Sequence, residues 1–125
     1  MLKKWLEGKK AEKEKYRLAD EKEKRFFAGL ENYTPEASDT NVMLLKKLVQ
    51  IAEESCTQDV KITTTDLTLG SGLGMDSLAI ADFLMAAEEE FDTEILFMET
   101  ITENSTLWDV FLLLHYCAFR WENNS

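Results

Sequence analysis

The feature that most constrains the fold is a glycine-rich loop that runs into a strongly periodic amphipathic segment. The loop at 69–72 (Leu-Gly-Ser-Gly) leads into 73–78 (Leu-Gly-Met-Asp-Ser-Leu), and the periodic segment ends at Phe91. Asp76 and Ser77 are both residues that start helices, because a side-chain oxygen accepts a hydrogen bond from the free N–H groups of the first turn. We therefore expect a helix over about 77–91, with the Ser77 hydroxyl exposed where the helix dipole favours an anion.

This helix is expected to have an apolar core face and an opposite face on which apolar and acidic residues alternate. At about 100° per residue, one broad stripe forms the core face, and it comprises Ile80, Phe83, Leu84, Ala87 and Phe91. Four residues lie on the opposite side and form what we call the acidic ridge: Leu78, Asp82, Met85 and Glu89. Two interpretations stay open from spacing alone. In the first, the exposed apolar residues are single surface residues, which are common and need no explanation. In the second, they are anchors with acidic flanks on which basic partners dock.

The remaining pattern predicts a small all-α protein. Ser38, Asp39 and Thr40 offer N-caps for a helix over about 41–55, and a short helical turn is expected within 96–101. Ser105 and Thr106 cap a last helix to about Trp121, with Asp109 in the capping-box position. A long polar loop at 56–74 separates the first two helices, and its scattered apolar residues indicate that it packs across them. The threonine run 63–65 has β-propensity but no visible partner strand. The fold class is thus a four-helix bundle with three main helices, one short helix and a long first loop.

Charge divides the chain into two parts. Residues 1–30 hold ten Lys/Arg against six Asp/Glu, a net +4, whereas 31–125 hold the remaining four against eighteen, a net −14. We expect a charged, partly helical extension and linker over 1–35 and a compact acidic domain over 36–125. An acidic domain repels nucleic acid and steers toward basic patches on proteins, so DNA or RNA binding by this domain is not expected.

Several classes of protein are disfavoured by what the sequence contains. No apolar run approaches the length of a membrane span, and the N-terminus has no secretory apolar stretch. Cys56 and Cys117 form no disulfide or metal pattern and are expected to be free thiols in a reducing cytoplasm. His115, the only histidine, lies in an apolar helix and is expected to be a packed or surface histidine rather than a functional one. A hydrolase would need a Gly-x-Ser-x-Gly elbow, and an ion-binding loop an Asp-x-Asp-x-Asp-Gly pattern; neither is present.

Residues 73–78 resemble the Leu-Gly-x-Asp-Ser-Leu motif of the acyl carrier protein family. Residues 79–95 (Ala-Ile-Ala-Asp-Phe-Leu-Met-Ala-Ala-Glu-Glu-Glu-Phe-Asp-Thr-Glu-Ile) resemble the recognition helix and its exit in the discrete bacterial type. The resemblance is strong over 69–95 and extends more weakly across 40–121. The preceding Leu-Gly, the acidic ridge and the Glu-Glu-x-Phe-x-x-Glu-Ile close make it specific.

The resemblance implies a carrier that is not itself an enzyme. A magnesium-dependent phosphopantetheinyl transferase would attach 4′-phosphopantetheine from coenzyme A to Ser77, with Asp76 assisting, and the arm would carry an acyl group as a thioester. Ser77 has no base of its own, which fits activation by a partner. Acyl-processing enzymes with basic patches would dock on Leu78, Asp82, Met85, Glu88 and Glu89. An acyl-chain cleft would be lined by Leu84, Ala87, Phe91 and Ile95.

The chain also departs from the family pattern. Ser71 and Gly72 stand where acidic residues are common, and the apolar 96–98 replaces a Pro and an acidic short helix. The last helix is apolar on most faces, so we expect cover from the extension, a second copy or a dedicated partner. We interpret the chain as a specialised carrier in fatty acid, lipid or secondary metabolite synthesis. An unprimed adaptor and a peptidyl or D-alanyl carrier stay open as alternatives.

Overall fold

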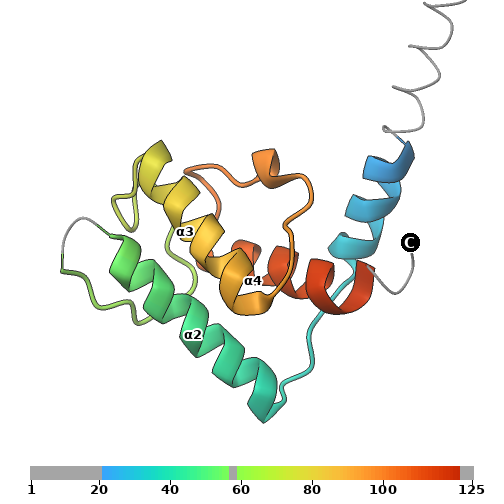
Figure 1. Cartoon of the computed structure of the whole chain (residues 1–125), viewed down its shortest axis with the longest axis horizontal. Coiled ribbons are helices and arrows are strands. Elements are labelled where there is room, and N and C mark those ends of the chain that lie inside the picture. The colour runs from blue at the N-terminus through green and yellow to red at the C-terminus, as the bar shows by residue number, and fades with distance from the viewer. Residues whose placement is uncertain (1–20, 57–58, 122–125) are drawn as a thin grey trace, which may run out of the picture. The chain divides into compact units, whose positions relative to one another are not determined.

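The computed structural model describes residues 21–56 and 59–121 (Figure 1). Contacts divide the chain into two units, Met1–Asn32 and Tyr33–Ser125. In the first unit the described residues 21–31 are helical, and residues 1–20 of the expected extension lie outside the described residues. The second unit begins at Tyr33, three residues before the boundary expected from the sequence.

The second unit is the predicted small helical bundle with a long first loop. Its α-helices are α2 (Asp39–Ser55), α3 (Ser77–Phe91) and α4 (Leu107–Tyr116), and η1 (Met98–Thr100) is the short one. All three α-helices contact one another, and α2 and α3 lie side by side in Figure 1. Over the described residues, strand-like pairing is limited to one bridge between Thr68 and Thr106.

Polar side chains set where the helices begin. Ser38 caps α2 by accepting from the Asn41 N–H, so that helix begins two residues earlier than expected. Thr106 and Asp109 form the predicted reciprocal capping box at α4. Both caps satisfy N–H groups that have no partner inside the helix.

The last helix is not α-helical throughout. The sequence predicts one helix to about Trp121, whereas α4 ends at Tyr116 and continues as the π-helix η2 (Cys117–Trp121). In a π-helix each N–H pairs five residues back rather than four. The change widens the helix over its final residues.

The core lies where the three α-helices meet. Its fully buried members include Leu48 and Ala52 of α2, Phe83 and Ala87 of α3, and Val110 and Leu114 of α4. The long loop also contributes, as its scattered apolar residues predicted: Ile62, Leu69, Leu73 and Met75 are buried. Burial of such side chains is the main stabilising term for a domain of this size.

Part of the cover expected for the last helix comes from the start of the second unit itself. The ring of Tyr33 lies 5.6 Å from that of His115 and 5.3 Å from that of Tyr116. Trp108 and Phe119 remain 37% and 49% exposed. Among the described residues, no helix is both long enough and apolar enough to cross a lipid bilayer.

Candidate functional site

A tight hydrogen-bonded loop fixes the approach to Ser77. The Leu73 N–H donates to the Thr68 carbonyl at 2.9 Å, and the Met75 N–H donates to the Leu69 carbonyl at 2.9 Å. The side chains of Leu69, Leu73 and Met75 are buried and anchor the loop to the core. Because both backbone and side chains are held, α3 starts from a defined position.

Gly72 allows this loop to close. A Cβ at this position would lie 2.6 Å from the Thr68 carbonyl oxygen and 2.7 Å from the Thr68 nitrogen. Backbone atoms cannot move aside without breaking the turn. We therefore expect Gly72→Ala to lower the free energy of unfolding by about 1–3 kcal/mol, a cost typical of overpacking.

Urea denaturation measures this change, and Gly74→Ala is the matched control. Gly74 has φ +73°, but nothing lies within 4 Å of an added Cβ. Gly74→Ala should therefore cost only the strain of a left-handed backbone at alanine, about 1 kcal/mol. A Gly72→Ala cost no larger than that of Gly74→Ala would contradict the close-approach argument.

The same loop is tied to the chain segment that leads into α4. Leu69 N–H donates to the Ser105 carbonyl at 2.9 Å, and Gly70 N–H donates to the Glu103 carbonyl at 2.8 Å. An added Cβ on Gly70 would meet Glu103 Cβ at 2.6 Å. The loop before α3 and the segment before α4 are therefore joined next to Ser77.

Asp76 and Ser77 form the N-terminus of α3. Asp76 is the N-cap, and its Oδ1 accepts from the Ala79 N–H at 2.8 Å. Its Oδ2 has no hydrogen-bond partner among the described residues. Ser77 is the first helical residue and its side chain is exposed. The hydroxyl thus stands at the positive end of a helix dipole, next to a carboxylate oxygen open to solvent.

A groove of about 690 Å³ begins at Ser77 and runs between α3 and the segment around η1. Its apolar lining consists of Ile80, Ala81, Leu84, Met98 and Ile101. Its polar lining consists of Ser77, Glu99, Thr102, Glu103 and Asn104. Since Ser77 and Leu84 are seven residues apart, the groove follows roughly 10 Å of helix. Its lining can contact both the apolar and the polar parts of a linear group.

The four residues predicted to line an acyl-chain cleft do not all reach this groove. Leu84 lines it. Ala87, Phe91 and Ile95 lie in the closed interior, each at most 7% exposed. Phe91 packs edge-on against Phe111 with ring centroids 6.2 Å apart. Only Leu84 of the predicted set is therefore accessible from the groove.

The acidic ridge lies on the outside of α3. Leu78 and Met85 are 70% and 64% exposed, and Asp82 and Glu89 are exposed as well. Glu88 differs from them because its Oε2 accepts from the Ile95 N–H at 2.8 Å and holds the exit of the helix. The acidic ridge therefore combines two exposed apolar side chains with two exposed carboxylates.

Sequence reasoning missed the second wall of the groove. Met98, Ile101, Thr102 and Asn104 line it, yet their segment has no periodicity that assigns side chains to a face. The sequence feature that pointed to this wall was the apolar segment 96–98, whose low charge departs from the family pattern. A short 3₁₀ turn gives too few residues to establish a stripe.

Comparison with known families agrees with this geometry. The model of the phosphopantetheine attachment site family matches residues 46–110, just over half of the chain. The matched region contains Ser77, the loop before it and the groove beside it. The chain belongs to the phosphopantetheine-attachment family. No solved structure matches the chain closely enough to be reported as similar.

The chain is accordingly a carrier whose domain is the site of covalent 4′-phosphopantetheine attachment. Carrier domains of this family are generally not catalysts, and they interact with a phosphopantetheinyl transferase and with the enzymes that process the carried group. The residues beside Ser77 fit such an arm. An exposed hydroxyl is available for esterification, and amide-bearing and apolar stretches of the arm would find both polar and apolar groove walls.

His115 of the carrier is buried and doubly hydrogen-bonded. Asn41 Nδ2 donates to the Glu36 carbonyl at 2.8 Å, which leaves Asn41 Oδ1 facing His115 Nε2, also at 2.8 Å. Nε2 therefore carries the proton, and Nδ1 accepts from the Tyr33 hydroxyl. Burial lowers the pKa of His115. Of the packed and surface positions that the sequence left open, the histidine takes the packed one, and it joins the start of the unit to α2 and α4.

Neither cysteine of the carrier forms a disulfide. Cys117 is buried. Cys56 is half-buried, and burial together with the nearby Glu53 carboxylate raises the pKa of its thiol. A raised pKa reduces the thiolate fraction at neutral pH and hence the reactivity.

Proposed function

We propose that the chain is an acyl carrier in which Ser77 bears the phosphopantetheine arm. The single observation that supports this most directly is the exposed Ser77 hydroxyl at the first position of α3, with the groove starting beside it. The exposed position leaves that hydroxyl open to a transferase. The free Oδ2 of Asp76 is suited to the transferase's metal ion, since hard divalent cations take carboxylate oxygens.

Among the described residues, the groove beside Ser77 offers carboxylates but no imidazole or amine that could act as its base. His115 is engaged with Tyr33 and Asn41, and the groove lining contains no histidine or lysine. Activation of the hydroxyl therefore falls to the transferase, in keeping with a carrier that is not an enzyme.

The acidic ridge supports an acyl rather than a peptidyl or D-alanyl cargo. Its carboxylates steer enzymes with basic docking patches, and Leu78 and Met85 supply apolar anchors once contact is made. We assign the cargo to fatty acid, lipid or secondary metabolite synthesis in the cytoplasm. An intact mass of the protein purified from its native host tests this. An aminoacyl increment on the arm would contradict an acyl cargo.

Intact mass spectrometry also tests attachment. The full chain is incubated with coenzyme A, magnesium and a broad-specificity phosphopantetheinyl transferase. We expect one phosphopantetheine increment on the wild type and none on Ser77→Ala, because Ser77 carries the exposed hydroxyl at the first position of α3.

Ser71→Ala is the matched control, since Ser71 is another exposed serine six residues earlier, bonded to the Thr68 hydroxyl at 2.9 Å. It should be modified like the wild type. An increment that persists in Ser77→Ala would assign attachment elsewhere. No increment with any transferase would favour an unprimed adaptor.

A further inference from the structure

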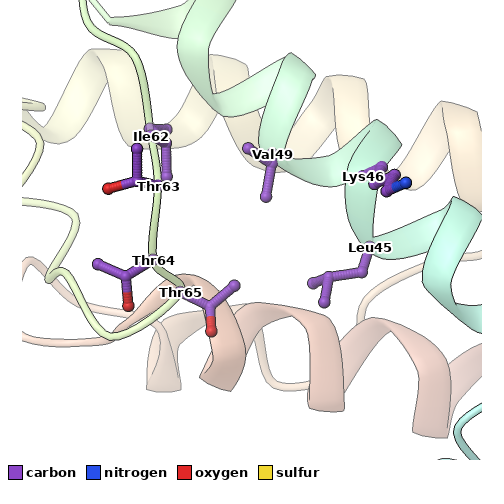
Figure 2. A pocket seen from close by; sticks show the side chains of 7 residues that line it. All are labelled: Leu45, Lys46, Val49, Ile62, Thr63, Thr64 and Thr65. Atoms are coloured by element: carbon purple, nitrogen blue, oxygen red, sulfur yellow. The ribbon is translucent and has the colours of Figure 1, made fainter.

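The threonine run 63–65 borders a second groove that the proposed carrier function does not use. Figure 2 shows the chain around Thr63 and Thr64 running straight beside α2, with an open space between them. This groove has a volume of about 490 Å³. It is lined by Leu45, Lys46, Val49, Ile62, Thr63, Thr64 and Thr65. We call it the threonine-edge groove.

The backbone along this groove has unused hydrogen-bonding groups. The Ile62 N–H donates to Glu53 Oε2 of α2 at 2.8 Å, so that edge of the chain faces α2. Thr64, two residues further along, lines the groove together with Thr63 and Thr65. Among the described residues neither the N–H nor the C=O of Thr64 has a partner; only the Thr64 hydroxyl is engaged, with Asp66.

The side chains of the groove combine an apolar surface with one positive charge. Leu45 and Val49 point from α2 into the space in Figure 2, and Ile62 is buried beside it. Of the described residues that line the groove, Lys46 is the single charged one. It has no carboxylate within ion-pair distance among the described residues. Within a region of net −14, this lysine marks a place where a carboxylate of a partner is attracted rather than repelled.

We propose that the threonine-edge groove binds an extended segment of a partner protein by strand addition. The partner backbone hydrogen-bonds to the N–H and C=O of Thr64, and an apolar side chain rests on Leu45 and Val49. A carboxylate of the partner pairs with Lys46. Main-chain bonds supply affinity and the alternating side chains supply specificity, as in other cases of strand addition to an exposed edge.

An extended segment suits this groove better than a helix or a second copy of the chain. A helix satisfies its own backbone groups and would leave those of Thr64 unused. A second copy would bring another region of net −14 against this one. Charge and backbone geometry therefore favour a partner strand with a carboxylate.

The groove and the acidic ridge can be occupied at the same time. Lys47, one residue after Lys46 and about 100° around the helix, pairs with Glu90 of α3 at 2.8 Å. The α3 side of α2 is thus a different face from the one that lines the groove. A partner in the groove would hold the carrier while enzymes dock on α3.

Peptide selection on the full chain tests the proposal. A display library of random linear decapeptides is panned against the immobilised protein, and enriched peptides are synthesised with a fluorophore for anisotropy titration. We expect alternating apolar residues with an Asp or Glu. We also expect Val49→Asp to weaken binding at least about tenfold and Lys46→Glu about fivefold. Met43→Asp, at an α2 residue 60% exposed outside the groove, should leave binding unchanged.

A backbone readout distinguishes strand addition from ordinary side-chain docking. Amide hydrogen exchange at Thr64 should slow when the peptide binds, because its N–H gains an acceptor. Thermal melts of each variant verify folding, and Lys46→Glu changes an exposed residue that is not part of the core. Three results would overturn the proposal: no enriched peptide, binding lost in Met85→Glu but kept in Val49→Asp, or an unprotected Thr64 amide in the complex.

Discussion

Reversing two charges on the acidic ridge, with Asp82→Lys and Glu89→Lys together, should slow attachment of phosphopantetheine about tenfold at low salt. Both carboxylates are exposed on the outer side of α3, where they attract a basic transferase before contact. Their replacement by lysine repels that partner. The initial rate of coenzyme A transfer to the full chain, followed by intact mass, measures the effect.

The control carries the same change of net charge elsewhere. Glu54→Lys with Asp59→Lys reverses two exposed carboxylates on the end of α2 and the following loop. The attachment rate of this variant should fall much less than that of the ridge variant. The difference between the two rates should shrink as salt is added, because salt screens the charges. Equal losses in both variants would show that only overall charge matters and that the ridge is not a docking surface.

The second large effect concerns His115. Its ring is buried, donates to Asn41, accepts from Tyr33 and lies 4.6 Å from the ring of Phe119. His115→Ala removes this packing and leaves polar groups without partners. The free energy of unfolding should fall by roughly 2–4 kcal/mol in urea denaturation at pH 7.5.

Acid should also weaken the wild type through this residue. Burial lowers the pKa of folded His115 below its ordinary value near 6.5. The unfolded chain therefore binds the extra proton first as pH falls, so stability present above pH 6.5 is lost between that value and the lower folded pKa.

Comparison with a residue that cannot titrate isolates this contribution. His115 is the only histidine, so urea denaturation from pH 7.5 to 5.5 reports chiefly on it. His115→Gln keeps a donor and an acceptor but has no proton to bind. Its stability should change less with pH over this range. Identical pH profiles for His115→Gln and the wild type would contradict the assignment.

The sequence predicted the helices well because their starts are set by local chemistry. The bounds of α3 follow from Asp76 as a cap and from a strong 3.6-residue period, and the capping box of Thr106 and Asp109 is equally local. The placement of Ser77 at the mouth of α3 needed nothing beyond this. Conversion of the last helix to a π-helix at Cys117 had no local signal in the sequence.

The groove walls could not be read from the sequence for a related reason. One wall belongs to α3 and follows from its period, but the other comes from the segment around η1, whose position depends on bonds such as Gly70 N–H to Glu103. Such contacts join residues more than thirty positions apart. The predicted cleft therefore used only α3 and its exit, and it did not include the wall around η1.

The state of the two cysteines has a practical consequence for measuring what this carrier holds. Cys117 is buried and Cys56 has a raised thiol pKa, so both would react slowly with alkylating reagents at neutral pH. A thiol at the end of a solvent-exposed arm would react faster than either. Brief maleimide labelling of the unaltered protein would then count empty arms directly, while loaded arms stay unlabelled, without any cysteine being replaced.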